Sequence, residues 1–199
     1  MRKNLKAACI GIGVISLILM VISIILDISG NTGLDEGLRS QIVRHDWIEM
    51  AACAVAFIFA FIYVSKDATK SAARYYKAYC YTVLVAEFLA MAITIYFTAV
   101  QINTSGQALM LVIIFTIWLA GFCPLLFLSF VPDLGQTVSI ALAVIAALTN
   151  LIMPVGAFNF QLPVVPTLLR SFVKMLMIVL LYFLVVAKYE NKIARGKAV

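Results

Sequence analysis

The chain has 199 residues, of which 64% are hydrophobic and only 12% are charged, and its formal net charge is +6. A mean hydropathy of +1.08 excludes an ordinary soluble domain and predicts an all-α integral membrane protein that crosses the bilayer several times. The positive charge does not indicate a nucleic-acid partner, because Lys and Arg lie between the apolar segments rather than on one basic face.

Six apolar segments of about 20 residues each are long enough to cross a hydrocarbon core of about 30 Å. The first follows a basic start, but it is longer than the apolar core of a signal peptide, so we interpret it as a retained span. No segment is left for a soluble domain, and the sequence predicts one six-helix transmembrane domain over residues 1–199. The expected spans, in chain order, are 7–28, 46–65, 78–101, 108–130, 137–158 and 168–187.

The distribution of basic residues predicts the orientation of the bundle. Of the 15 Lys and Arg residues, three lie in the N-terminal tail, four in the 66–77 connection and four in the C-terminal tail. With six spans these three segments fall on one side of the membrane. The positive-inside rule therefore predicts a protein of the cell membrane with both termini in the cytoplasm.

Span one begins with small residues, Ala7, Ala8 and Gly11, whose spacing lets another helix approach closely. This pattern predicts either packing within the bundle or docking of a partner membrane protein. The four cysteines lie inside apolar segments without a close pair, and we interpret them as small buried hydrophobic residues. Neither a disulfide nor a metal or cofactor site is expected from them.

Glu87 is the deepest charge, about 13 Å into the third predicted span at 1.5 Å per residue. Charge inside a bilayer is costly and by default indicates function. Thr94, Thr98 and Gln101 follow at helical spacing on the same face, so a polar line leads from Glu87 to the outer surface. Two interpretations stay open: a protonated Glu87 that hydrogen-bonds to another helix, or a site for a solute or proton.

Arg170 and Lys174 are four residues apart and share a face near the outer end of the sixth span. They either snorkel to the interface or pair with an acid on another helix. A helical side chain leans toward its own N-terminus, which here points outward and away from Glu87. Pairing with Glu49, near the outer end of the second span, is therefore the better prediction.

Glu49 also has a local explanation. Asp46 is a good N-cap and Glu49 follows three residues later, which fits a capping box at the start of span two. Under that interpretation His45, the only histidine, is an ordinary exposed residue. His45 with Glu49 is also the only candidate pair for acid–base chemistry, and it lies at the membrane edge, so we do not expect an enzyme.

Asn150 and Pro154 fall in the middle of the fifth predicted span. Proline lacks a backbone N–H, so the backbone carbonyl of Asn150 loses its helical hydrogen-bond partner. The free carbonyl and the Asn150 side-chain amide would then lie together as polar groups in the middle of the span. Broken helices near the midplane are common at transporter binding sites, but they also occur as plain kinks. Both interpretations stay open for this pair.

Two functional hypotheses follow from these residues. The first is a protein that binds a small solute in a polar cavity on the outer half of the bundle, with the 29–45 loop as a lid. In length, span count and small residues at the inner start of span one, the chain resembles the substrate-capture subunits of energy-coupling-factor vitamin importers. That resemblance implies a membrane scaffold and an ATPase module as partners. The alternative is a non-transport sensor, assembly factor or accessory subunit that acts through protein partners.

Overall fold

The computed structural model describes residues 2–29, 36–65, 70–100, 105–131, 134–152 and 164–196. All regular secondary structure in these ranges is α-helical, so the predicted all-α class is confirmed there. The helices are α1 (Arg2–Ser29), α2 (Glu36–Ser65), α3 (Lys70–Val100), α4 (Ser105–Phe130), α5 (Gln136–Ile152) and α7 (Val164–Gly196).

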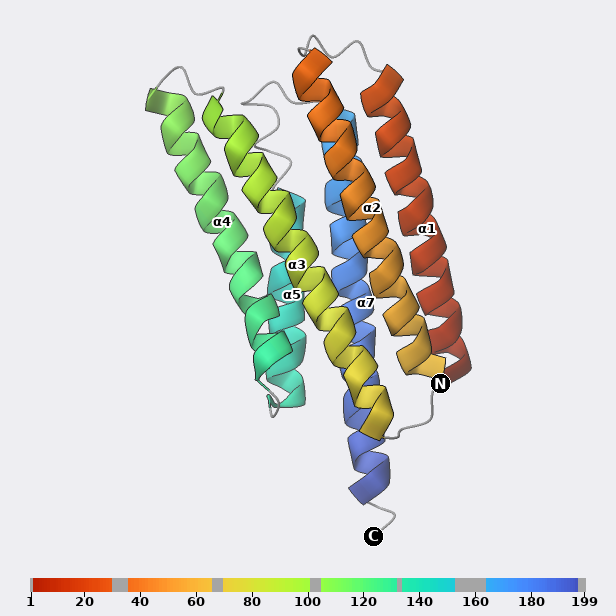
Figure 1. Ribbon diagram of the computed structural model, residues 1–199. Helices are drawn as coiled ribbons and strands as arrows, with labels where there is room; N and C mark the ends of the chain where they lie inside the picture. The colour runs from red at the N-terminus through yellow and green to blue at the C-terminus, as the bar shows by residue number, and fades with distance from the viewer. Residues whose placement is uncertain are drawn as a thin grey trace.

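The helices form a closed ring. Each one packs against two neighbours, in the order α1, α2, α3, α4, α5, α7 and back to α1, while α2 and α3 also touch α7 across the ring. Successive helices run in opposite directions, and both chain ends lie at the lower end of the bundle (Figure 1). Residues near the end of α1 and near the starts of α2 and α7 therefore meet at the upper end.

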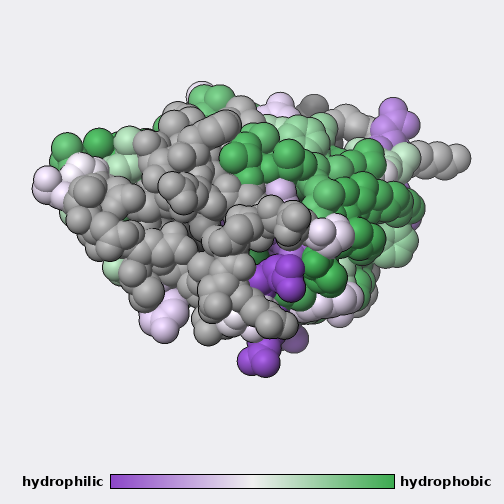
Figure 2. All heavy atoms as spheres, turned by 90° about the horizontal axis from the view of Figure 1, so that it is seen from above, coloured by the Kyte–Doolittle hydropathy of each residue, from purple (hydrophilic) through white to green (hydrophobic). Residues whose placement is uncertain are grey.

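Four helical segments in the described residues are long and apolar enough to cross a membrane: Asn4–Ser29, Ile42–Ser65, Ala108–Phe130 and Val164–Lys188. The outer face of α1 carries branched aliphatic side chains, among them Ile15, Ile18 and Ile22, each at least 41% exposed. Seen from above, hydrophobic atoms cover much of the flank that is not drawn in grey (Figure 2). Such a surface suits lipid rather than water, so the helices are compatible with a membrane-spanning bundle.

The bounds of α2 correct the predicted lid loop. Residues 36–45 form the first turns of α2 rather than a lid loop, because α2 begins at Glu36 and runs without a break to Ser65. The helix therefore starts well before the apolar span, whose hydropathy pattern begins only at Ile42. Hydropathy reports which residues suit lipid, and helix ends need not coincide with that boundary.

The prediction that the cysteines are buried is wrong for Cys123, which is exposed on α4, whereas Cys9, Cys53 and Cys80 are buried as expected.

Most of the buried core residues lie on α2, α3 and α7, and α1, α4 and α5 contribute the others. Tyr79 on α3 is fully buried, and its hydroxyl group donates a hydrogen bond to the backbone carbonyl of Met177 on α7. Next to it, the Cys53 and Met177 sulfur atoms are 3.1 Å apart. These contacts fix α3 and α2 against α7 below the polar residues described next.

Gly121 lets α4 and α5 approach closely, and we expect Gly121→Ala to destabilise the fold. A Cβ at this position would lie 2.0 Å from Thr149 Oγ1 and 2.9 Å from Thr149 Cβ, so the backbones must separate. Overpacking of this kind costs about 1–3 kcal/mol, to be measured by denaturant unfolding in detergent. Gly11→Ala is the matched control, because its Cβ would meet nothing within 4 Å. Equal stability of the two variants would contradict this packing.

Candidate functional site

Arg170 on α7 links three helices. Its Nη1 atom donates hydrogen bonds to Asp46 Oδ1 on α2 at 2.5 Å and to Asp27 Oδ2 on α1 at 3.3 Å. Both carboxyl groups are almost completely buried, with exposures of 0% for Asp46 and 1% for Asp27. A buried carboxylate is stable only with a cation or several donors, so Arg170 is the residue that makes this pair of acids tolerable.

Lys174 and Glu49 form a second ion pair one helical turn further along, with 3.2 Å between Nζ and Oε1. Glu49 lies three residues after Asp46, and Lys174 lies four residues after Arg170, so the two pairs follow each other along facing surfaces of α2 and α7. The predicted pairing of Lys174 with Glu49 across the bundle is confirmed. The Oε1 atom lacks a well-aligned hydrogen bond, so charge attraction rather than hydrogen bonding holds this pair.

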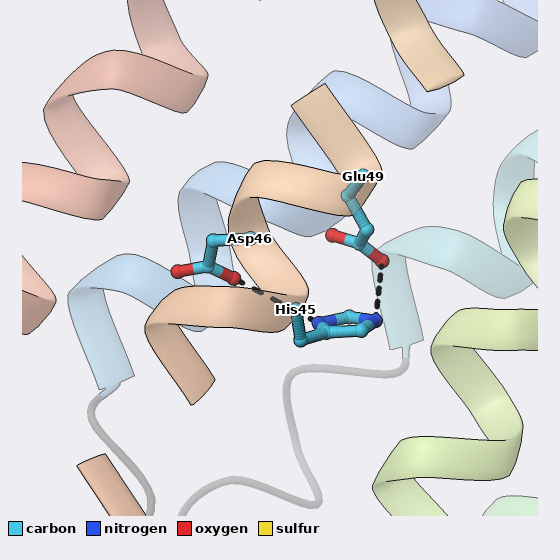
Figure 3. A group of neighbouring side chains, drawn as sticks. All are labelled: His45, Asp46 and Glu49. Carbon is cyan, nitrogen blue, oxygen red and sulfur yellow. Dashed lines mark ion pairs between the residues drawn. The ribbon is translucent and has the colours of Figure 1, made fainter. Parts of the chain in front are cut away.

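His45 lies beside Asp46 and Glu49 and is 9% exposed, so the prediction of an ordinary exposed residue is wrong. Its Nε2 atom is 3.6 Å from Glu49 Oε1, and its Nδ1 atom is 3.9 Å from Asp46 Oδ1. Figure 3 shows the imidazole ring between the two carboxyl groups, with one ring nitrogen toward each. The predicted capping box is wrong as well, because α2 begins at Glu36 and Asp46 is inside the helix, where backbone N–H groups already have helical partners.

A small cavity adjoins these ion pairs, and Glu87 lies on it. Its volume of about 10 Å³ is the space open to the centre of a water-sized sphere, which is room for about one water molecule. Glu87 is 5% exposed, and Asn150 of α5, whose amide donates a hydrogen bond to the Ala146 carbonyl at 3.1 Å, lies close to its carboxyl group. The lining residues are Met20, Glu49, Cys53, Val83, Ala86, Glu87, Arg170, Val173, Lys174 and Met177.

We call these seven ionisable residues the ionic cluster: Asp27, His45, Asp46, Glu49, Glu87, Arg170 and Lys174. They come from α1, α2, α3 and α7. The cluster holds four acids against two obligate cations, so its formal charge is −2 when all acids are ionised and His45 is neutral. Unbalanced negative charge is costly in a site of low dielectric constant. The cluster is therefore suited to accept positive charge.

Unsatisfied polar atoms concentrate in the same place. Among the residues that the structure describes, six buried side-chain N or O atoms have no hydrogen-bond partner, and four of them belong to the ionic cluster. Three of the four are carboxylate oxygens, which accept hydrogen bonds or bind cations. The four atoms are Asp27 Oδ1, His45 Nε2, Asp46 Oδ2 and Glu49 Oε1. Glu49 Oε1 still has Lys174 Nζ at 3.2 Å as an ionic partner, so the free oxygens of Asp27 and Asp46 are the acceptors with the least compensation.

The sequence-predicted site residues divide into three groups. Glu49, Glu87, Asn150, Arg170 and Lys174 meet around the cavity or its ion pairs. The side chains of Thr94 and Thr98, together with Gln101 and Pro154, lie outside the described part of the chain. Ala7, Ala8 and Gly11 lie on α1 near the N-terminus, at the other end of the bundle from the ion pairs (Figure 1).

Sequence reasoning missed Asp27 altogether and gave Asp46 and His45 the wrong roles. Asp27 directly ends the charge-free run of α1, and an acid in that place is a signal that it faces inward rather than lipid. Asp46 and Glu49 are three residues apart, and that spacing by itself puts both on one helical face.

No protein-family model, curated protein sequence or solved structure matches this chain. What the ionic cluster does is therefore argued from its own geometry and charge.

Proposed function

We propose that this chain binds a small solute at the ionic cluster and serves as the substrate-capture subunit of an uptake transporter. The observation that carries the proposal is the cluster itself: seven ionisable side chains from four helices beside a cavity, with four polar atoms lacking hydrogen bonds. Charge inside a membrane protein is costly and is typical of substrate or ion pathways. A purely structural role needs neither the surplus of carboxyl groups nor the unsatisfied acceptors.

The orientation supports uptake from outside. Both chain ends lie at the end of the bundle opposite the ion pairs (Figure 1), and eleven of the 15 basic residues lie in the two tails and the 66–77 connection. By the positive-inside rule that end is cytoplasmic in the cell membrane, and we take each of the six described helices as one span. The ionic cluster then lies in the outer half of the bundle, the side from which a capture subunit takes up its solute.

Partner docking is proposed for the small residues at the other end of α1. A Cβ added at Gly11 would meet nothing within 4 Å, so this face is open, whereas one at Gly13 would lie 3.3 Å from the Phe57 ring. Gly13 thus packs inside the bundle, and Ala7, Ala8 and Gly11 offer a smooth outer surface to another membrane helix. A partner that supplies energy for transport fits there.

The test is solute-dependent thermal stabilisation of the purified chain in detergent. A solute that binds the folded state raises the unfolding temperature, so a panel of small ions, amino acids and vitamins identifies the class. We expect the stabilisation to disappear in Glu49→Gln and to change in size in Lys174→Met. Lys188→Met is the matched control, since this lysine lies at the far end of α7, over the Tyr76 ring at 5.1 Å. A response that persists unchanged in both cluster variants would refute the proposal.

A second candidate is a non-transport sensor or accessory subunit, in which the ionic cluster only fixes how the helices pack. One observation favours it: Arg170 and Lys174 are already paired with acids of the chain, and the cavity has room for about one water molecule. In that case no solute of the panel raises the unfolding temperature. Removal of the Glu49–Lys174 pair then changes the free energy of unfolding but no binding property.

A further inference from the structure

We propose that His45, Asp46 and Glu49, the outer part of the ionic cluster, bind a divalent transition-metal cation. The inference rests on the proposed function and names the chemical class of its solute. The three residues are buried, and one potential ligand atom from each lies within 4.8 Å of the other two. They belong to two successive turns of one rigid helix, so the backbone holds their spacing (Figure 3).

The donor set selects the metal class. An imidazole nitrogen with two carboxylate oxygens suits first-row ions of the Mn²⁺ to Zn²⁺ series, whereas Ca²⁺ and Mg²⁺ prefer oxygen ligands alone. The triad contains no thiolate, and the nearest cysteine on α2, Cys53, has its sulfur against Met177 instead. Soft ions that require sulfur are therefore not favoured.

Distances within the triad fit a shared ion. Two atoms that each lie about 2.1 Å from one metal, at bond angles of about 90–120°, are separated by roughly 3.0–3.6 Å. His45 Nε2 and Glu49 Oε1 are 3.6 Å apart, and both are buried without a hydrogen bond. Asp46 retains one oxygen, Oδ2, that is buried and not hydrogen-bonded, while Arg170 holds its Oδ1. Because the two ring nitrogens face different carboxyl groups, binding of one ion by all three residues requires the His45 ring or the Asp46 carboxyl group to rotate.

Size and charge point the same way. The cavity that Glu49 lines has room for about one water molecule, which is too little for a vitamin, although His45 and Asp46 are not among its lining residues. A divalent cation offsets the formal charge of −2 that the ionic cluster has when all four acids are ionised. Lys174 must then leave Glu49 Oε1, and Glu87 offers it a second carboxyl group on the same cavity. Metal binding thus moves one lysine between two acids, from α2 to α3.

The experiment uses the full chain without an affinity tag, in detergent, titrated with Mn²⁺. Bound and unbound Mn²⁺ are counted by electron paramagnetic resonance, and pulsed measurements detect the nitrogen of a coordinated imidazole. Because the chain has one histidine, such a signal can come only from His45. We expect one bound ion per chain with an imidazole nitrogen signal, and an increase in thermal stability with Zn²⁺ as well.

Two variants decide the outcome. His45→Gln should weaken Mn²⁺ binding by at least about tenfold and remove the nitrogen signal, since a ligand is lost. Lys188→Met, at the far end of α7 over the Tyr76 ring, is the matched control and should bind within about threefold of the wild type. Absent binding, or binding that His45→Gln leaves unchanged, overturns the metal site. Stabilisation by an organic solute without metal binding would overturn this inference while the proposed function stands.

Discussion

Arg170→Met is expected to destabilise the folded chain by about 3–5 kcal/mol, the largest effect of any single substitution in the ionic cluster. Among the residues that the structure describes, the Arg170 guanidinium group is the one cation that donates a hydrogen bond to Asp27 or Asp46. Both acids are at most 1% exposed. Removing it leaves two carboxyl groups together in a low-dielectric site. The measurement is the free energy of unfolding in mixed detergent, followed by circular dichroism.

A rescue experiment separates lost charge pairing from lost packing around Arg170. Replacing both acids by amides in the Arg170→Met background removes the uncompensated charges and keeps the side-chain volumes close to the original. We expect more than half of the lost stability to return, because the penalty is that of unpaired charge. If Arg170→Met costs less than about 1 kcal/mol, the three-helix contact is a weak surface pair and the description of the site is wrong.

Lys174→Met is expected to be nearly as costly, at about 3 kcal/mol, because it leaves Glu49 without its cation in a site where Glu87 is also an acid. The double variant Glu49→Gln/Lys174→Met removes both members of the pair. It should therefore be more stable than the sum of the two single effects predicts, with a coupling energy of about 1–3 kcal/mol. The measurement is a double-mutant cycle of unfolding free energies.

The control for this cycle pairs Glu49→Gln with Lys188→Met, at opposite ends of the bundle. Their effects should add within about 0.5 kcal/mol, because distant sites without shared partners are independent. Equal coupling in both cycles would mean that the measured energy reflects a general change in the detergent-solubilised state and not the ion pair.

The all-α class and the apolar helices follow from the sequence because hydropathy acts locally, segment by segment. The Glu49–Lys174 pair follows too, since the lean of a helical side chain toward its N-terminus limits which acid a lysine can reach. Each of these inferences depends on the sequence of a single helix and on the order in which the helices cross the membrane.

Asp27, Asp46 and His45 could not be placed this way. Asp46 was interpreted as a helix cap because the apolar pattern begins near it, whereas α2 starts at Glu36, in polar sequence that hydropathy does not mark as helical. His45 is buried because the face of α2 that carries Asp46 and Glu49 packs toward α1 and α7. That packing belongs to the tertiary structure and cannot be read from the sequence of α2 alone. That Asp27 and Asp46 share one guanidinium group depends on α1 packing against both α2 and α7, and sequence spacing carries no such information.

The central claim is that the ionic cluster binds a solute, and native mass spectrometry of the chain released from its own membranes tests it most directly. Bound small molecules and metals are quantified in the wild type and in the Glu49→Gln/Lys174→Met double variant, in which both members of the ion pair are removed together. The account predicts a bound solute in the wild type that is lost from the double variant. The same solute content in both proteins, or none in either, would contradict it.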